Sequence, residues 1–427
     1  MAEIEAEKEL AQRAVVALGY LGVFLAAVVV HLSVHGPLYR YRGYVAELSV
    51  PRAIEAMSLL GLLAMALPAV PRRPSDLLLH LHLLLPVLPM LVIWSCSGGS
   101  DGMTLATCLG FLIATGTRLL PLRLPKGPRF EGRLVDLALL GTSTAIVGSL
   151  ILVVGTGSIS FDPMQVHAFR AVVAERLSPA LVYLSSVGYA ALIPATIAVG
   201  LATRRRWIVV TAVVLAVVQF GVVAHRAAFL LVVVTVAIWL AGRRRWAPLS
   251  LIAGLAVVLA VAAFVPAWDR LGTVAMVMFD RGVFLPALIN GVYHDFFAHE
   301  PLVLWSNSKI GLGIVAPRYD LPLPEVIGRY LGTNEHANTG WIGSGFMHAG
   351  WIGIMVYAAL LGVLLRLVDA LRSHIGSIAG AAAFFAAPLF LVFTSVDPPI
   401  AGLTFGLVPL LAIAWLRAPE PTDRATN

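Results

Sequence analysis

The fold class is decided by residues 204–245, which read RRRWIVVTAVVLAVVQFGVVAHRAAFLLVVVTVAIWLAGRRR. Two apolar runs, 207–224 and 227–242, lie between two arginine triplets, and each run approaches the roughly 20 residues that a membrane-spanning helix needs. Lys and Arg collect in the cytoplasmic loops of membrane proteins. Both triplets are therefore expected on the cytoplasmic side, with the chain between them crossing the membrane and returning.

The composition of the whole chain supports this interpretation. Of 427 residues, 59% are hydrophobic and 12% are charged, whereas soluble domains carry roughly 25% charged residues. A soluble globular domain is therefore excluded. The net charge of +7 is explained by cytoplasmic loops, so no nucleic-acid partner is expected. The two cysteines, Cys96 and Cys108, lie in or beside apolar segments, which indicates neither a disulfide framework nor a zinc site.

The hydropathy pattern predicts an all-α, polytopic integral membrane protein that forms one transmembrane domain over residues 1–427. About 12 transmembrane helices are expected, at 14–34, 53–71, 77–97, 103–122, 134–156, 180–202, 207–224, 227–242, 248–266, 350–371, 377–396 and 401–416. Counting outward from the two arginine triplets places both termini in the cytoplasm, and nineteen of the 30 Lys and Arg residues then lie on the cytoplasmic side.

The opposite side carries one large polar loop, 267–349, whereas the other loops on that side, 35–52 and 157–179, are modest. A long loop in a compact protein usually carries function. Two apolar stretches within it, 282–297 and 323–332, predict short helices that dip into the membrane or lie on it. The function is therefore expected at the non-cytoplasmic face.

Arginines near this face are candidates for binding an anion. Arg226 stands between two apolar runs. It is either a turn residue whose side chain extends to the membrane interface or part of a phosphate site. The second alternative is chemically suitable because a guanidinium binds phosphate oxygens in a bidentate fork.

Arg281 precedes an apolar stretch that ends near Asp295. If this stretch is one regular helix, Arg281 and Asp295 are separated by about four turns and share a face; the alternative is an interfacial helix whose charges face water.

His336 is the candidate general base. It lies in a glycine-rich and aromatic segment directly before the tenth expected span, and an imidazole, which ordinarily titrates near about pH 6.5, suits this role. A structural or solvated histidine is the alternative, and Asp295 and Glu335 compete for the same role. No metal site is expected, since His80 and His82 are two residues apart and would point to opposite sides of a helix.

Three segments of the chain are similar to the Wzy-type oligosaccharide repeat-unit polymerases of bacterial O-antigen and capsule assembly, a group that includes the O-antigen ligases. The segments are VVAHRAAFLLV at 222–232, FDRGVFLPALINGVYHDFF at 279–297 and NEHANTGWIGSGFMHAGWIGIMVYAALLG at 334–362. With the order of spans, the resemblance covers roughly 130–420. Many ligases have His followed directly by Asn, whereas this chain reads His336-Ala337-Asn338, which favours a polymerase slightly.

The resemblance implies a glycosyltransferase in the bacterial inner membrane with its active face in the periplasm. The donor would be a growing glycan on undecaprenyl pyrophosphate, the acceptor a lipid-linked repeat unit, and a chain-length regulator a further partner; no cofactor is implied. The resemblance implies that His336 is catalytic, that Arg226 and Arg281 bind pyrophosphate and that Asn338 positions the substrate. Three further candidates come from the same loop: Asp295 as a catalytic residue, and Arg270 and Tyr293 as substrate-positioning residues.

The implied chemistry fits these residue types. Pyrophosphate is a good leaving group whose developing negative charge needs stabilisation, and the sequence offers arginines but no metal-ligand cluster. A metal-independent reaction is therefore expected, and direct attack by the acceptor hydroxyl would invert the anomeric configuration. The alternatives are a ligase-like oligosaccharyltransferase, which uses the same donor, and a flippase or transporter of lipid-linked oligosaccharides.

Overall fold

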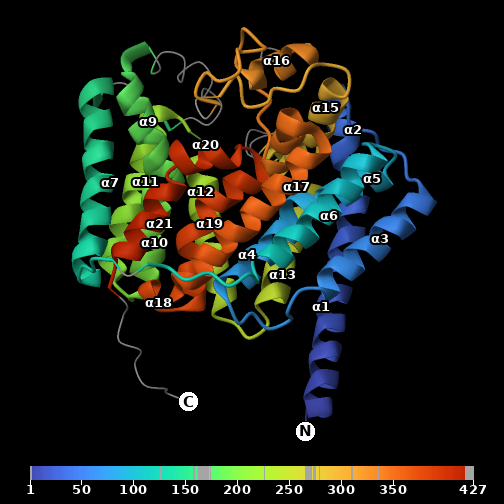
Figure 1. Cartoon of the computed structure of the whole chain (residues 1–427), viewed down its shortest axis with the longest axis horizontal. Coiled ribbons are helices and arrows are strands. Elements are labelled where there is room, and N and C mark those ends of the chain that lie inside the picture. The colour runs from blue at the N-terminus through green and yellow to red at the C-terminus, as the bar shows by residue number, and fades with distance from the viewer. Residues whose placement is uncertain are drawn as a thin grey trace.

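The computed structural model describes residues 2–125, 127–156, 159–161, 173, 175–225, 227–264, 272, 276–277, 279–308, 311–333 and 336–418. These residues form a bundle of helices that pack side by side, most of them running between the same two ends of the molecule (Figure 1). Within the described residues, the β pairing is limited to an isolated bridge between Phe130 and Arg417. The prediction of an all-α fold is confirmed.

The helices have the following bounds, with η1, η3, η5 and η6 as π-helical turns and η2 as a 3-10 turn: α1 Ala2–Val30, η1 His31–His35, α2 Gly36–Leu38, η2 Arg40–Arg42, α3 Val50–Met65, α4 Pro74–His82, η3 Leu83–Val87, α5 Leu88–Ser95, α6 Asp101–Thr117, α7 Gly132–Val154, α9 Pro179–Val187, η5 Gly188–Leu192, α10 Ile193–Ala202, α11 Arg206–Val223, α12 Ala227–Gly242, α13 Ala247–Phe264, η6 Asp280–Phe284, α15 Leu285–Phe297, α16 Leu323–Tyr330, α17 Trp341–Ala370, α18 Arg372–Ile375, α19 Ile378–Thr394, α20 Pro398–Leu403 and α21 Leu407–Leu416.

Among the described residues, seven helices are long and apolar enough to cross a membrane: Ile4–Leu38, Pro74–Ser95, Gly132–Val154, Pro179–Ala202, Arg206–Val223, Ala247–Phe264 and Trp341–Ala370. The helices α12, α19 and α21 are apolar but shorter. This architecture is that of a polytopic membrane protein. The expected spans fall on helices, but the span at 401–416 is divided between α20 and α21. The count of twelve stays a prediction.

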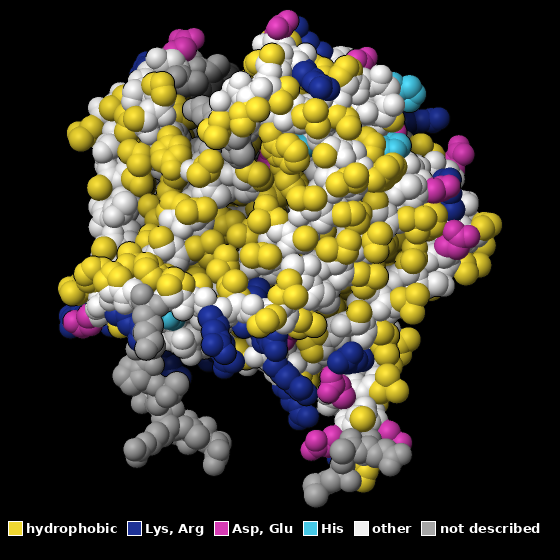
Figure 2. Space-filling model, viewed as in Figure 1, with side chains coloured by type: hydrophobic (Ala, Val, Ile, Leu, Met, Phe, Trp, Pro, Cys, Tyr) yellow, Lys and Arg dark blue, Asp and Glu magenta, His cyan; other side chains and the backbone are white. Residues whose placement is uncertain are grey.

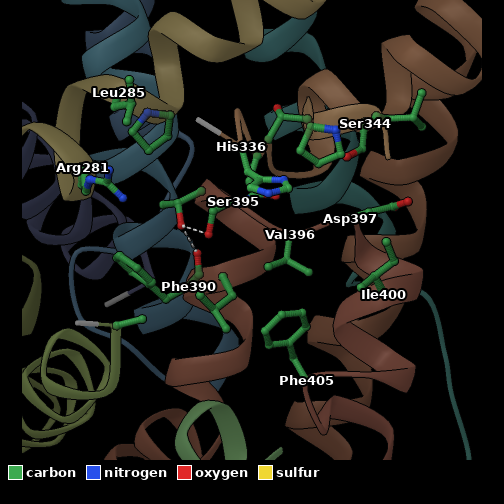
Figure 3. A pocket seen from close by; sticks show the side chains of 18 of the residues that line it. Arg281, Leu285, His336, Ser344, Phe390, Ser395, Val396, Asp397, Ile400 and Phe405 are labelled. Carbon is green, nitrogen blue, oxygen red and sulfur yellow. Dashed lines mark hydrogen bonds between the residues drawn. The ribbon is translucent and has the colours of Figure 1, made fainter. Parts of the chain in front are cut away.

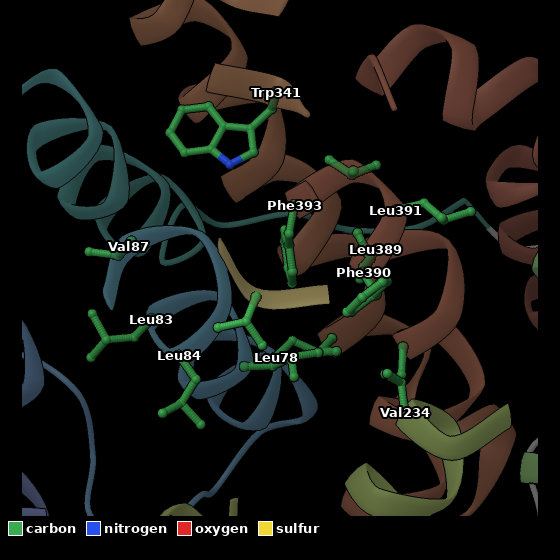
Figure 4. Close-up of a cluster of buried hydrophobic side chains, with 14 of the residues drawn as sticks. Leu78, Leu83, Leu84, Val87, Val234, Trp341, Leu389, Phe390, Leu391 and Phe393 are labelled. Carbon is green, nitrogen blue, oxygen red and sulfur yellow. The ribbon is translucent and has the colours of Figure 1, made fainter. Parts of the chain in front are cut away.

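The core is built around α19, whose residues Ala379–Thr394 are all buried. The run of small residues from Ala379 to Ala383 allows α10, α12 and α4 to approach this helix closely. Farther along, Phe390 and Phe393 pack against apolar side chains of α4, η3 and α12, including Leu78, Leu84 and Val234, in a cluster closed by Trp341 of α17 (Figure 4). An apolar helix buried on every face is central to the bundle.

One end of the bundle is rich in basic residues. Figure 2 shows a hydrophobic belt around the middle of the molecule, with Lys and Arg side chains gathered below it. Buried ion pairs connect helices at this end: Arg118 binds Asp76, while Arg417 and Arg205 bind Asp136 at 3.0 and 3.2 Å. We call this the basic end. The large loop and the helices α15 and α16 lie at the opposite end (Figure 1), so the charge asymmetry expected from the sequence is present.

The helix α17 is broken near its start. Ala349 and Gly350 have non-helical backbone angles, and Gly350 has a φ of +60° that favours glycine. The break separates a buried turn, Trp341–His348, from the long segment that follows, and the expected span at 350–371 starts at this break. Two loop segments expected to be helical are indeed helical, as η6 with α15 and as α16. The break and these helices shape the candidate site.

Candidate functional site in a polar cavity

A cavity of about 500 Å³ opens at the end of the bundle opposite the basic end. Its walls come from η6 and α15, the start of α12, the buried turn of α17 and the segment that connects α19 to α20 (Figure 3). Figure 3 shows Arg281 on one side of the cavity, Asp397 and Ile400 on the other, and His336 between them. A cavity of this volume is large enough to bind one or more sugar rings or a phosphate group.

Four of the residues that the sequence singles out line this cavity together: Arg281, Tyr293, His336 and Asn338. Arg281, His336 and Asn338 are exposed, whereas Tyr293 is buried. They come from η6, α15 and the segment that precedes α17, so the fold brings together residues that are up to 57 positions apart in the chain. A cation, an imidazole and an amide around one cavity can bind an anion and take up a proton.

The segment that carries His336 and Asn338 is fixed at several points. The Tyr293 hydroxyl donates to the Ala337 carbonyl at 2.8 Å, and the Ala337 N–H donates to the Pro324 carbonyl at 2.9 Å. Burial raises the pKa of Tyr293 well above its usual value, and Asp397 acts in the same direction, so this phenol remains a donor. The positioning role expected of Tyr293 is thus compatible with its contacts, which act through the backbone of the loop.

A second anchor follows in the chain. The Asn290 side-chain oxygen accepts hydrogen bonds from the Thr339 hydroxyl at 2.7 Å and from the Gly343 N–H at 3.1 Å. Gly340 lies so close to α19 that a Cβ atom would stand 2.7 Å from the carbonyl oxygens of Val392 and Phe393. Any larger residue would push this segment off α19. His336 and Asn338 therefore project from a loop that is held from both sides.

Asp295 is not brought to the cavity wall. It is exposed, and its carboxylate lies 3.0 Å from Nδ1 of His294, its neighbour in sequence. The π-helical turn at Asp280–Phe284 explains why Arg281 and Asp295 do not share a face as a regular helix would predict. One additional residue in a turn rotates the following helix by roughly 100°. The candidates Arg226 and Arg270, and the competitor Glu335, lie outside the described residues.

Sequence reasoning missed a buried pair in the cavity wall, His348 and Asp397. The His348 Nε2 atom lies 3.1 Å from Asp397 Oδ2, and both side chains are almost fully buried. His348 Nδ1 accepts a hydrogen bond from the Trp305 backbone N–H at 3.2 Å. The ring hydrogen is therefore on Nε2, which donates a hydrogen bond to Asp397. The Trp305 ring stacks on the imidazole at 4.9 Å. The tautomer of His348 is therefore set by the fold.

Asp397 retains an unused acceptor. Its Oδ1 atom is buried and accepts no hydrogen bond from any residue that the structure describes. A buried carboxylate oxygen without a donor is costly. Little in the sequence indicates Asp397 as a site residue, except that it is the one acidic residue between Asp369 and Glu420. Its partner is 49 positions away.

An apolar groove of about 980 Å³ lies beside the cavity. It runs between α12 and α13, and Leu230 and Phe390 line both the groove and the cavity. Near the cavity it is lined by Gly282 and Val283, which follow Arg281 in the chain, and it extends to Arg244 at the basic end. The groove therefore adjoins the polar cavity.

Neither a metal-ligand cluster nor a similar known protein identifies the function of this site. Among the described residues, no group of three or more His, Cys, Asp or Glu side chains is placed to hold a metal ion. No protein-family model matches the chain, and neither a curated protein nor a solved structure matches it. The function must therefore be argued from the chain's own residues and geometry.

Proposed function

We propose that this chain is a membrane glycosyltransferase of the repeat-unit polymerase type. It would transfer a growing glycan from undecaprenyl pyrophosphate to a lipid-linked oligosaccharide repeat unit at the outer face of the bacterial inner membrane. The observation that carries this proposal is that two unlike spaces lie next to each other: a polar cavity with Arg281 in its lining, and an apolar groove whose lining includes the next residues, Gly282 and Val283.

This arrangement suits an amphipathic substrate. A polyprenyl chain would lie in the groove between α12 and α13, where burial of its apolar surface stabilises binding. The glycan would occupy the polar cavity, and the pyrophosphate would lie at the boundary, near Arg281. A substrate that is soluble throughout would make no use of the groove. The basic end would then be cytoplasmic, with both termini, and the cavity would face the periplasm.

Arg281 would stabilise the leaving group. When the bond between the anomeric carbon and the pyrophosphate oxygen breaks, negative charge grows on that oxygen, and a guanidinium fixed nearby lowers the free energy of the transition state. Arginine suits this role because it remains charged at any physiological pH and forms bidentate hydrogen bonds with phosphate oxygens. Arg226, whose neighbours His225 and Ala227 line the cavity, would be a second cation, as the resemblance implies.

His336 would accept the proton of the attacking group. The acceptor hydroxyl oxygen bonds to the anomeric carbon of the donor, the pyrophosphate leaves with the electrons of the broken bond, and the hydroxyl proton passes to the imidazole. A single displacement of this kind inverts the anomeric configuration. Asp397 Oδ1 would accept a hydrogen bond from another sugar hydroxyl and so orient the ring, while His348 holds its second oxygen. No metal takes part in this scheme.

The proposal is tested with purified full-length protein in lipid nanodiscs and an undecaprenyl-pyrophosphate-linked repeat unit. A ladder of longer lipid-linked glycans, resolved by electrophoresis, is the expected result. Transfer to lipid A-core without a ladder would mean a ligase. Movement of the unchanged substrate between the leaflets of a vesicle, with no product, would mean a transporter. Either of these two results would overturn the polymerase assignment.

A further inference from the structure

The groove between α12 and α13 has polar side chains at one end only. These are Arg244, Arg245, Trp246 and Ser250, which belong to the turn between the two helices and to the first turn of α13, whereas the other described residues in the lining are apolar or glycine. Because α12 begins at the cavity wall with Ala227, the turn that follows it lies at the basic end, where Figure 2 shows Lys and Arg side chains gathered. The groove is therefore polar at the end far from Arg281.

The groove is open to the surroundings of the bundle. Its lining combines buried apolar residues, such as Leu84 of η3 and Ile238 of α12, with exposed ones, such as Val233 of α12 and Val257 of α13. A Cβ atom added to Gly254, in the middle of α13, would meet no described atom within 4 Å. An exposed apolar surface on a protein that spans a membrane faces lipid, so a hydrocarbon chain can enter this groove sideways.

The length of the groove exceeds the depth of one leaflet. On α13 the lining extends from Leu249 to Ala262, which corresponds to about 20 Å along a helix. One leaflet contributes half of the bilayer's hydrocarbon core, or about 15 Å. An acyl chain that enters from the basic end is therefore covered over its whole depth, and the part of the groove near Gly282 and Val283 lies beyond its end.

The two arginines in the lining have no acidic partner there. Arg244 and Arg245 are exposed, neither forms an ion pair or a side-chain hydrogen bond with any described residue, and no described Asp or Glu lines the groove. Arg243 of the same triplet differs, because its guanidinium lies 4.6 Å from the centroid of the Trp239 ring and neither of these residues lines the groove. Two guanidinium groups at the end of an apolar groove complement an anionic head on an apolar chain.

We propose that the groove binds an anionic phospholipid of the leaflet at the basic end. Its phosphate accepts hydrogen bonds from Arg244 and Arg245, Trp246 lies at the level of the headgroup, and one acyl chain lies between α12 and α13. Burial of the chain and attraction by the two charges together hold the lipid. The inference goes beyond the proposed function, since it involves neither a glycan nor Arg281. A polyprenyl pyrophosphate with its head at Arg281 has the opposite orientation and leaves the two arginines of the groove unsatisfied.

The headgroup is tested in nanodiscs of phosphatidylcholine that contain a trace of a phosphatidylglycerol with a diazirine in its acyl chain. At trace amounts, the yield of photo-crosslinking follows affinity. Mass spectrometry should map the crosslinks to α12 and α13, and their yield should exceed that of the matched phosphatidylcholine probe by about 25-fold, which is about five-fold for each arginine. Equal yields from the two probes would overturn the anionic head.

Two double substitutions separate this site from the general charge of the basic end. Arg244→Gln with Arg245→Gln should remove the preference for phosphatidylglycerol. Arg206→Gln with Arg243→Gln removes the same charge from the same end, at exposed residues outside the groove lining, and should keep the preference. Equal losses in the two proteins would mean that surface charge alone attracts the lipid, and the proposal would then be wrong.

The position of the chain is tested by filling the groove. Gly254→Phe places a ring over the open face of α13 and should lower the yield of the phosphatidylglycerol probe to that of the phosphatidylcholine probe. Gly141→Phe, at an equally open position on α7, should leave the yield unchanged. A full yield in Gly254→Phe would place the acyl chain outside the groove and contradict the proposal.

Other occupants of the groove give different results. Loss of the phosphatidylglycerol crosslinks in Arg281→Ala would mean that the lipid enters from the cavity with its head at that arginine, which would overturn the proposed orientation. Absence of crosslinks from α12 and α13 would mean that a second copy or a partner covers the groove, and this too would overturn the proposal. A lipid site that depends on Arg244 and Arg245, in a protein that forms no glycan ladder, leaves this inference standing and refutes only the proposed function.

Discussion

The imidazole of His348 donates from Nε2 to Oδ2 of Asp397 across 3.1 Å, and this bond joins the buried turn of α17 to the segment that follows α19. The pair lines the same cavity as Arg281 and His336. It leaves Asp397 Oδ1 buried and without a donor among the described residues. The cavity therefore has a cation and an exposed imidazole in its lining, beside a buried carboxylate oxygen without a donor.

Asp397→Asn tests the carboxylate. The amide oxygen can still accept from His348, so the buried pair is kept, but an N–H₂ donor replaces Oδ1 in the cavity. Reversing this polarity should cost about 1–3 kcal/mol of substrate binding, which corresponds to a KM for the lipid-linked acceptor raised by about 5- to 150-fold in the ladder assay. Asp369→Asn is the matched control, because Asp369 binds Ser75 in a different part of the bundle. An unchanged KM in Asp397→Asn would contradict the role assigned to this oxygen.

His336→Gln tests the proposed base. Glutamine retains the size and polarity of the side chain but accepts no proton, so kcat should fall by about 10²- to 10⁴-fold with KM little changed. His299→Gln, in the same loop but outside the cavity wall, should behave as the wild type.

Asp295→Asn tests the second catalytic candidate from the sequence. Because Asp295 is exposed and does not line the cavity, kcat should change by less than about two-fold. If Asp295→Asn were inactive and His336→Gln active, the assignment would be reversed.

Arg281 is tested by two substitutions of graded severity. Arg281→Ala should lower kcat by about 10²- to 10³-fold, as the loss of one preorganised donor to a developing oxyanion does. Arg281→Lys keeps the charge but not the bidentate fork, so its loss should be smaller, about ten-fold. Arg329→Ala serves as the control, since Arg329 belongs to the same loop but is exposed and paired with Glu325. Equal activity of Arg281→Ala and Arg329→Ala in the ladder assay would remove Arg281 from the site.

Gly350→Ala tests the break in α17. Because Gly350 has a φ of +60°, a Cβ atom at this position should cost about 1–3 kcal/mol. A lower midpoint of thermal unfolding in detergent is expected, by a few degrees. The control is Gly141→Ala in the middle of α7, where a Cβ atom meets open space and should be neutral or slightly stabilising. Equal midpoints for the two variants would mean that the break does not depend on glycine.

Hydropathy predicted the helices well because burial in a bilayer leaves few alternatives for an apolar run of this length. The arginine triplets around α11 and α12 also predicted the basic end. The break in α17 coincides with the start of an expected span at residue 350, since the glycines there interrupt the helix. Bounds at several helix ends differ by a few residues, and α3 ends at Met65 rather than near residue 71.

The candidate site was only partly predictable. Arg281, His336 and Asn338 could be named because each stands out as a polar residue in an apolar or glycine-rich setting. The contacts of His348 with Asp397 and of His35 with Asp280 join residues 49 and 245 positions apart, and no local pattern indicates such pairings. The π-helical turn at Asp280 was equally hidden, because one additional residue in a turn leaves no mark on hydropathy.

The central claim is that a polyprenyl pyrophosphate binds with its head at Arg281 and its chain in the groove between α12 and α13. Photo-crosslinking of a benzophenone-labelled polyprenyl pyrophosphate to the protein in nanodiscs, mapped by mass spectrometry, tests it most directly. Crosslinks on α12 and α13 that are lost in Arg281→Ala and kept in Arg329→Ala are expected. Crosslinks that fall instead on the separate apolar pocket around Leu134 and Ile413, or that persist in Arg281→Ala, would contradict the account.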